Sequence, residues 1–167
     1  MDYKFLINIF LFLQKFLFTI INMDYSKKRQ DLQYGEDKER EVLIMLQEKF
    51  GQVQKYRNKY NLKDFFIYNQ REKRVFWEFE LKSRKCDINT YPSLCFGKNK
   101  FDDSVEKLKK NIKQTYLFYL NGELYKWDLI QPKLQEHEYY FGSIANKKRN
   151  DDDHEAVFVY TKYLTKI

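Results

Sequence analysis

The pattern of apolar and polar positions from residue 35 onward predicts a helix followed by three strands. Apolar residues recur at helical spacing between Val42 and Phe50, which predicts a helix over residues 36–49 that is closed by Gly51. Runs rich in aromatic and β-branched residues come next and are separated by polar turns. The expected strands are a short one near 53–56 and longer ones over 64–68 and 74–83.

The second half of the chain predicts one further helix and two hairpins. Asn121-Gly122 lies between two apolar runs and is a strong signal for a tight hairpin turn. Helix, strands, helix and strands in this order predict an α/β fold with a mixed sheet. The expected elements are a long loop over 84–100, a helix over 102–112, and strands over 114–120, 123–130, 138–144 and 156–160.

The first residues have a different character from the rest. Residues 5–21 are strongly apolar but include Gln14 and Lys15, and they are somewhat short for a membrane-spanning helix. Met23-Asp24-Tyr25 repeats the opening Met1-Asp2-Tyr3. We therefore expect residues 1–22 to be an upstream extension of the reading frame and 23–167 to be one domain. A membrane anchor through residues 5–21 is the alternative interpretation.

Composition narrows the classes of function only modestly. The chain has 167 residues and a formal net charge of +7, which fits a polyanionic partner. Lysine-rich coding is the alternative explanation of that charge. Two isolated cysteines and two isolated histidines provide no paired spacing for a structural zinc site or a disulfide framework.

Candidate chemistry lies in the predicted hairpin. Asp64 opens one strand and Glu80-Leu81-Lys82 lies in the next, so pairing of the strands would bring the two carboxylates close together. Residues two apart on a strand share a face, so Glu80 and Lys82 should point the same way. Two carboxylates and a lysine could bind Mg²⁺ and activate water against a phosphodiester. The alternatives are a strand-edge acid at Asp64 and a solvated polar face on the second strand.

An acid, a spacer and Glu-x-Lys resemble the signature of the PD-(D/E)XK nuclease superfamily, and here Lys63-Asp64 stands where the signature has Pro-Asp. From Tyr34 to the C-terminus the chain also resembles uncharacterised nuclease-like proteins of large DNA viruses and phages. The resemblance implies a restriction-endonuclease-like αβββαβ core, here with an additional C-terminal β hairpin. It also implies Mg²⁺ or Mn²⁺ held by Asp64 and Glu80, and Lys82 as a catalytic residue.

The same resemblance suggests further residues and a setting. An acid on the first helix would assist the site, and we prefer Glu39 over Glu36 because Glu39 aligns with the apolar stripe. Double-stranded or branched DNA would be the partner, with homodimer formation left open, in the cytoplasm of a cell or infected host or in a virion. A catalytically silent binding or assembly module of the same fold is the second hypothesis. The residues expected to contact nucleic acid are Arg84, Lys85, Tyr91, Lys98 and Lys100.

Overall fold

The computed structural model describes residues 29–30, 32–58, 60–145 and 153–167. The chain divides into two compact units, Met1–Lys38 and Glu39–Ile167, and the described strands all lie in the second. The apolar segment 5–21 and the expected boundary at residue 22 lie outside the described residues. Among those that are described, no helix has the length and apolar character needed to cross a membrane.

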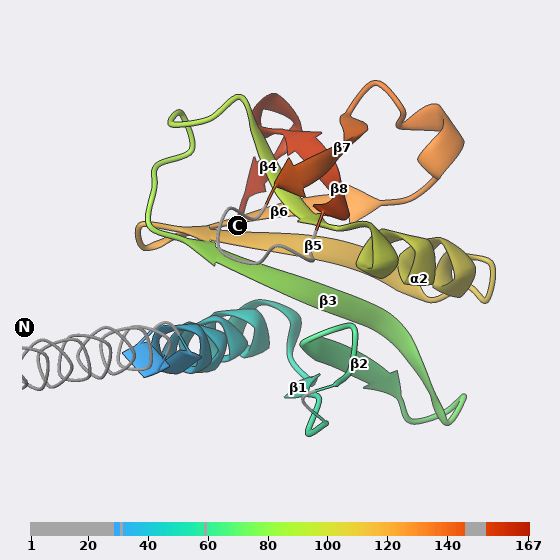
Figure 1. Ribbon diagram of the computed structural model, residues 1–167. Helices are drawn as coiled ribbons and strands as arrows, with labels where there is room; N and C mark the ends of the chain where they lie inside the picture. Colours follow the sequence, from blue (N-terminus) through green and yellow to red (C-terminus); the bar gives the residue numbers. More distant parts are fainter. Residues whose placement is uncertain (1–28, 31, 59, 146–152) are drawn as a thin grey trace, which may run out of the picture. The chain divides into compact units, whose positions relative to one another are not determined.

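The main sheet of the second unit is mixed and has six strands in the order β1-β2-β3-β5-β6-β9 (Figure 1). Neighbouring strands are antiparallel except β3 and β5, which run parallel. A parallel pair needs a crossover, and the chain makes it through β4 and the helix α2. The six strands are β1 Val53–Lys55, β2 Phe65–Asn69, β3 Arg74–Arg84, β5 Lys113–Leu120, β6 Glu123–Leu129 and β9 Thr165–Lys166.

Two helices cover opposite faces of this sheet. The part of the first helix that belongs to this unit, residues 39–50, buries Val42 and Leu46 against the β2–β3 side of one face. The helix α2, Lys98–Leu108, packs Phe101 into the core on the other face. Side chains of β5 divide between the two cores by strand alternation, so that Leu117 joins the first core and Phe118 the second.

The two turns predicted from glycine are confirmed. Gly51 has a positive φ of 78° and closes the first helix through a hydrogen bond from its N–H to the carbonyl of Gln47. Asn121 and Gly122 have φ values of 42° and 93°, and they join β5 to β6. Positive φ at both residues is what a tight type I′ hairpin requires.

A second, smaller sheet corrects the prediction of a long loop over 84–100. The strand β4, Ser93–Gly97, pairs with β8, Asp153–Tyr160, which pairs in turn with β7, Tyr139–Ala145. Leu94 and Phe96 are buried while their neighbours are only partly so, which is the alternation of a half-buried strand. The predicted C-terminal hairpin is thus present, but it pairs with β4 in a separate sheet.

The second helix also begins earlier than expected. It runs from Lys98 to Leu108 rather than over 102–112. Asn111 has a positive φ of 58°, so the chain turns before β5. The shift matters for function, because it places Lys98 and Lys100 in the first turn of a helix instead of a loop. Two short 3₁₀ helices, η1 Pro132–Leu134 and η2 Thr161–Tyr163, complete the described elements.

Candidate functional site

Pairing of β2 with β3 brings Asp64 beside Glu80, as the sequence predicts. Phe65 is opposite Phe79 in the antiparallel register. Just before that pair, the backbone N–H of Asp64 donates to the carbonyl of Phe79 over 2.9 Å. The N–H of Leu81 then donates to Asp64 Oδ2 over 2.7 Å. The backbone of the Glu-x-Lys strand therefore holds the Asp64 carboxylate next to Glu80.

Glu80 is completely buried beneath α2, with a relative exposure of 0%. Lys82 Nζ lies 2.6 Å from Glu80 Oε1. Lys100, in the first turn of α2, forms a second ion pair with the same oxygen. The other oxygen, Oε2, has no hydrogen-bond partner among the described residues. A buried carboxylate oxygen without a donor is costly, so this atom is suited to receive a cation or a donor.

The Asp64 carboxyl group is perturbed by its surroundings. Burial first, and then the neighbouring Glu80 carboxylate, raise its pKa from 3.8 to about 6. The hydrogen bond from Leu81 and the Lys100 and Lys82 charges act in the opposite direction. A partly buried carboxyl group whose charge is disfavoured by a neighbouring carboxylate is a feature of functional sites. A divalent cation between them would relieve that repulsion.

Lys63 is a buried lysine that sequence reasoning did not assign to the site. Its Nζ donates to the carbonyl of Lys100 over 3.0 Å and to Ser104 Oγ over 2.6 Å. Burial lowers its pKa to about 8, although the Glu80 carboxylate acts to raise it. Lys63 therefore ties the segment before β2 to the first turns of α2. These contacts depend on where α2 packs, and the local sequence pattern does not predict that position.

Glu78 shares the buried face with Glu80 but has a different environment. Tyr56 Oη donates to Glu78 Oε1 over 2.5 Å, and Gln114 Nε2 donates to Oε2 over 3.1 Å. Lys107 Nζ lies 2.9 Å from Oε2. Both carboxylate oxygens of Glu78 are thus satisfied by the protein. This carboxylate serves structure, and it offers an internal comparison for Glu80.

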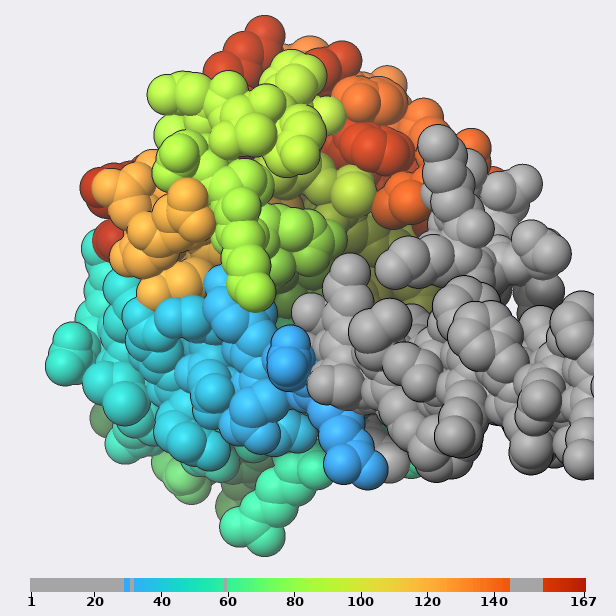
Figure 2. All heavy atoms as spheres, turned by 60° about the vertical axis from the view of Figure 1, so that its left-hand side comes forward, coloured from blue at the N-terminus to red at the C-terminus, as the bar shows by residue number. Residues whose placement is uncertain are grey.

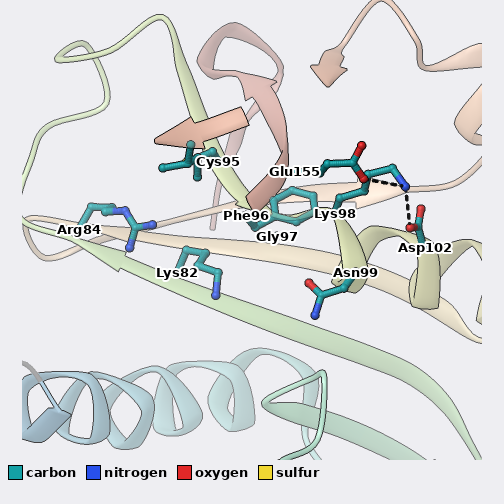
Figure 3. A pocket seen from close by; sticks show the side chains of 10 residues that line it. Lys82, Arg84, Cys95, Phe96, Gly97, Lys98, Asn99, Asp102 and Glu155 are labelled. Carbon is teal, nitrogen blue, oxygen red and sulfur yellow. Dashed lines mark hydrogen bonds and ion pairs between the residues drawn. The ribbon is translucent and has the colours of Figure 1, made fainter. Parts of the chain in front are cut away.

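An open cavity of about 680 Å³ lies beside this cluster, between the end of β3, the strand β4 and the start of α2. Figure 3 shows Lys82 and Arg84 at one end of the lining and Lys98, joined to Asp102 and Glu155, at the other. Lys98 Nζ lies 2.9 Å from Asp102 Oδ2 and 3.6 Å from Glu155 Oε2. Lys82 belongs both to the cavity lining and to the Glu80 ion pair, so it connects the two.

The other residues predicted for the site lie at different positions relative to the carboxylates and the cavity. Glu39 forms an ion pair of 2.5 Å with Lys55 on β1, so the structure gives this acid a partner outside the carboxylate cluster. Lys85 and Tyr91 are exposed and do not belong to the described lining of the cavity. Lys100, which was expected to contact nucleic acid, forms an ion pair with the buried Glu80 carboxylate.

Within the described part of the chain, no group of three or more acidic, histidine or cysteine side chains is arranged to hold a metal ion. Any cation here would therefore rest on Asp64 and Glu80 with few protein ligands. No protein-family model matches the chain, and no curated protein matches it either.

Proposed function

We propose that the protein is a metal-dependent nuclease that hydrolyses phosphodiester bonds in DNA, with Asp64, Glu80 and Lys82 at its centre. One observation carries the proposal. The Leu81 N–H fixes the Asp64 carboxylate beside Glu80, whose own partner Lys82 lines an open cavity with basic residues. An acidic pair next to a basic cavity is suited to bind a cation and a phosphate together.

The order of elements supports the resemblance to the PD-(D/E)XK superfamily. A helix, three antiparallel strands, a second helix and a strand parallel to β3 follow one another along the chain. This agrees with the αβββαβ order that the resemblance implies, if β4 is counted as an insertion before α2. The second sheet of β4, β8 and β7 would then be an addition to that core.

The residues present fit Mg²⁺ or Mn²⁺ in a site with few protein ligands. Mg²⁺ keeps several waters and commonly uses only one or two carboxylates together with substrate phosphates. Glu80 Oε2 lacks a partner among the described residues, and Asp64 carries a raised pKa that a cation would lower. When bound, such an ion would supply an activated water and neutralise charge on the phosphate.

The protein's own residues would hold the cation and stabilise the charge on the phosphate. Asp64 and Glu80 would orient the cation, since burial limits the freedom of Glu80 to turn away and the Leu81 N–H holds the Asp64 carboxylate. Lys82 would present a compact positive charge at the cavity, where negative charge develops on the phosphate during hydrolysis. Lys100 would balance the charge of Glu80 through their ion pair, and the pKa of Lys100 is raised because the Glu80 carboxylate outweighs the opposing effect of burial.

The test is cleavage of supercoiled plasmid and of a branched duplex in Mg²⁺. We expect Asp64→Asn and Glu80→Gln to abolish cleavage with the fold retained. Glu78→Gln is the matched control, because it removes a buried carboxylate from the same face of the same strand. Equal rates for wild type, Asp64→Asn and Glu80→Gln would overturn the assignment.

A second candidate function is favoured by the charges around Glu80. Lys82 and Lys100 already neutralise this carboxylate without a metal. A nucleic-acid-binding or assembly module that has no turnover would keep such pairs for stability. Binding of DNA that is equal in EDTA and in Mg²⁺, without cleavage in any divalent cation, would favour this second function.

A further inference from the structure

The second sheet carries a row of aromatic side chains on the face turned away from the core. Strand alternation sends Leu94, Val157 and Val159 into the core. The residues between them face the other way. In the register, Cys95 is opposite Phe158, Phe158 is opposite Tyr140, and Ser93 is opposite Tyr160.

The rings of this row lie against one another. Tyr140 and Phe158 stack with centroids 4.9 Å apart and an interplanar angle of 8°. Tyr160 follows at 5.4 Å from Tyr140. Tyr140 lies on β7, an edge strand of this sheet, and its side chain is 40% exposed. Phe158 and Tyr160 are partly exposed beside it. Rings that support one another and remain open to solvent in this way form a surface on which planar groups stack.

Gly142 contributes to the shape of the row. A Cβ at this position would lie 2.9 Å from Phe158 Cε2, so the absence of a side chain leaves room for the Phe158 ring. Ser93 Oγ and Tyr140 Oη are 3.1 Å apart and fix the outer end of the Tyr140 side chain. The rings are therefore held in place before any ligand arrives.

The aromatic row is continuous with the candidate active site. Cys95, the neighbour of Phe158 across the strands, also lines the cavity that contains Lys82 and Arg84. At the other end of the row, Lys162 Nζ lies 5.7 Å from the centroid of the Tyr160 ring. In Figure 2 the yellow-green residues that lead into β4 lie beside the red and orange residues of β8 and β7.

We infer that this face binds single-stranded nucleic acid and leads an unpaired strand to the cavity. Rings alone would accept many apolar partners, but cations at both ends of the row add charge complementarity to a phosphate backbone. In a duplex the bases are stacked on each other, whereas an unpaired strand offers base faces for Tyr140, Phe158 and Tyr160. The inference deepens the proposed function, because it names a single-stranded region as the substrate.

The experiment measures fluorescence anisotropy of labelled oligothymidylate, oligouridylate and a blunt duplex with the full chain. It is done in EDTA on the Asp64→Asn background, so binding is independent of cleavage. We expect the single strands to bind more tightly than the duplex. Tyr140→Leu should weaken single-strand binding by at least about fivefold, from roughly 1–3 kcal/mol per stacked base.

Two control variants separate stacking from damage to the fold. Tyr140→Phe keeps the ring and loses only the contact with Ser93, so it should bind as the parent does. Phe141→Ala removes the adjacent exposed ring, which packs against Phe101 and Tyr139 on the core side of the sheet. This variant should also leave binding within about twofold of the parent.

Tighter duplex than single-strand binding, or equal single-strand affinities for Tyr140→Leu and Tyr140→Phe, would overturn the inference. If single strands bind through Tyr140 but no divalent cation supports cleavage, the nuclease proposal fails while the inference about single-strand binding stands. Selective binding of only one of the two oligonucleotides would assign the surface to DNA or to RNA.

Discussion

The backbone N–H of Leu81 donates a 2.7 Å hydrogen bond to Asp64 Oδ2. This contact joins the residue that precedes β2 to the middle of the Glu-x-Lys strand. It places one carboxylate next to another that is completely buried. Burial first, and then the Glu80 carboxylate, raise the pKa of Asp64, although the Leu81 hydrogen bond itself acts to lower it. The ionised Asp64 carboxylate should therefore lower the free energy of unfolding, which can be measured.

Asp64→Asn should make the metal-free protein more stable at pH 8. The pKa of Asp64 is about 6 in the folded protein but near 3.9 in an unfolded chain, so the folded state binds this proton more tightly. Stability therefore falls as pH rises from about 4 through 6, by up to about 3 kcal/mol for a shift of this size. Urea unfolding in EDTA at pH 4.5 and pH 8 measures the difference between variant and wild type.

The control for Asp64→Asn is an acid that is not buried. Asp102→Asn is suitable, because the Asp102 side chain is 56% exposed in its ion pair with Lys98. The gain from Asp64→Asn should grow between the two pH values while the effect of Asp102→Asn stays nearly constant. A gain from Asp64→Asn that does not depend on pH would contradict the account of the carboxylate pair.

Lys100→Ala should destabilise the protein by about 1–3 kcal/mol, because it removes one cationic partner from a buried carboxylate. Lys98→Ala, two residues earlier in α2, removes a largely exposed pair and should cost clearly less stability than Lys100→Ala. Chemical denaturation of both variants checks this order. Equal losses would mean that the Lys100–Glu80 pair contributes no more than a surface contact.

Lys82→Ala should lower the cleavage rate by about 100-fold or more while Mn²⁺ binding stays nearly intact. Lys82 lines the cavity but is not a metal ligand, so its charge acts on the phosphate or the attacking water. Lys82→Arg should restore activity only in part, because the planar guanidinium group is broader than an ammonium group. Single-turnover cleavage gives the rates and calorimetry gives the metal affinity. Loss of Mn²⁺ binding in Lys82→Ala would contradict this division of roles.

Arg84 and Lys98 line opposite ends of the cavity, so both should contact phosphate. The double variant Arg84→Ala/Lys98→Ala should flatten the dependence of log affinity on log salt by up to about 1.4 for a single strand, from roughly 0.7 per contact. Titrations at several salt concentrations measure the slope. Lys133→Ala in η1, an exposed lysine outside the described cavity lining, is the control and should leave the slope unchanged.

The sequence predicted those parts of the site that depend on local pairing. A hairpin between β2 and β3 is enough to bring Asp64 to Glu80, and strand alternation is enough to direct Glu80 and Lys82 to one side. The positions of Lys63 and Lys100 could not be predicted in this way. Both depend on α2 packing over β3, which is a tertiary contact made across the crossover to β5.

The strand β4 escaped prediction for a related reason. Ser93–Gly97 is short, lies between Pro92 and a helix, and is stabilised by β8, more than fifty residues later in the chain. Its alternation of Leu94 and Phe96 was present in the sequence, but five residues carry little periodic signal. The aromatic row on the second sheet was hidden with it, because that row exists only when β4, β8 and β7 are paired.

A crystal structure of the protein soaked in Mn²⁺, with anomalous scattering used to locate the ion, tests most directly whether Asp64 and Glu80 share one cation. We expect one peak between Asp64 and Glu80 Oε2, at ligand distances close to the roughly 2.0–2.1 Å that Mg²⁺ has to oxygen. We also expect the peak to disappear in Asp64→Asn crystals treated in the same way. Anomalous density elsewhere, with Glu80 still held only by Lys82 and Lys100, would contradict a cation site shared by the two carboxylates.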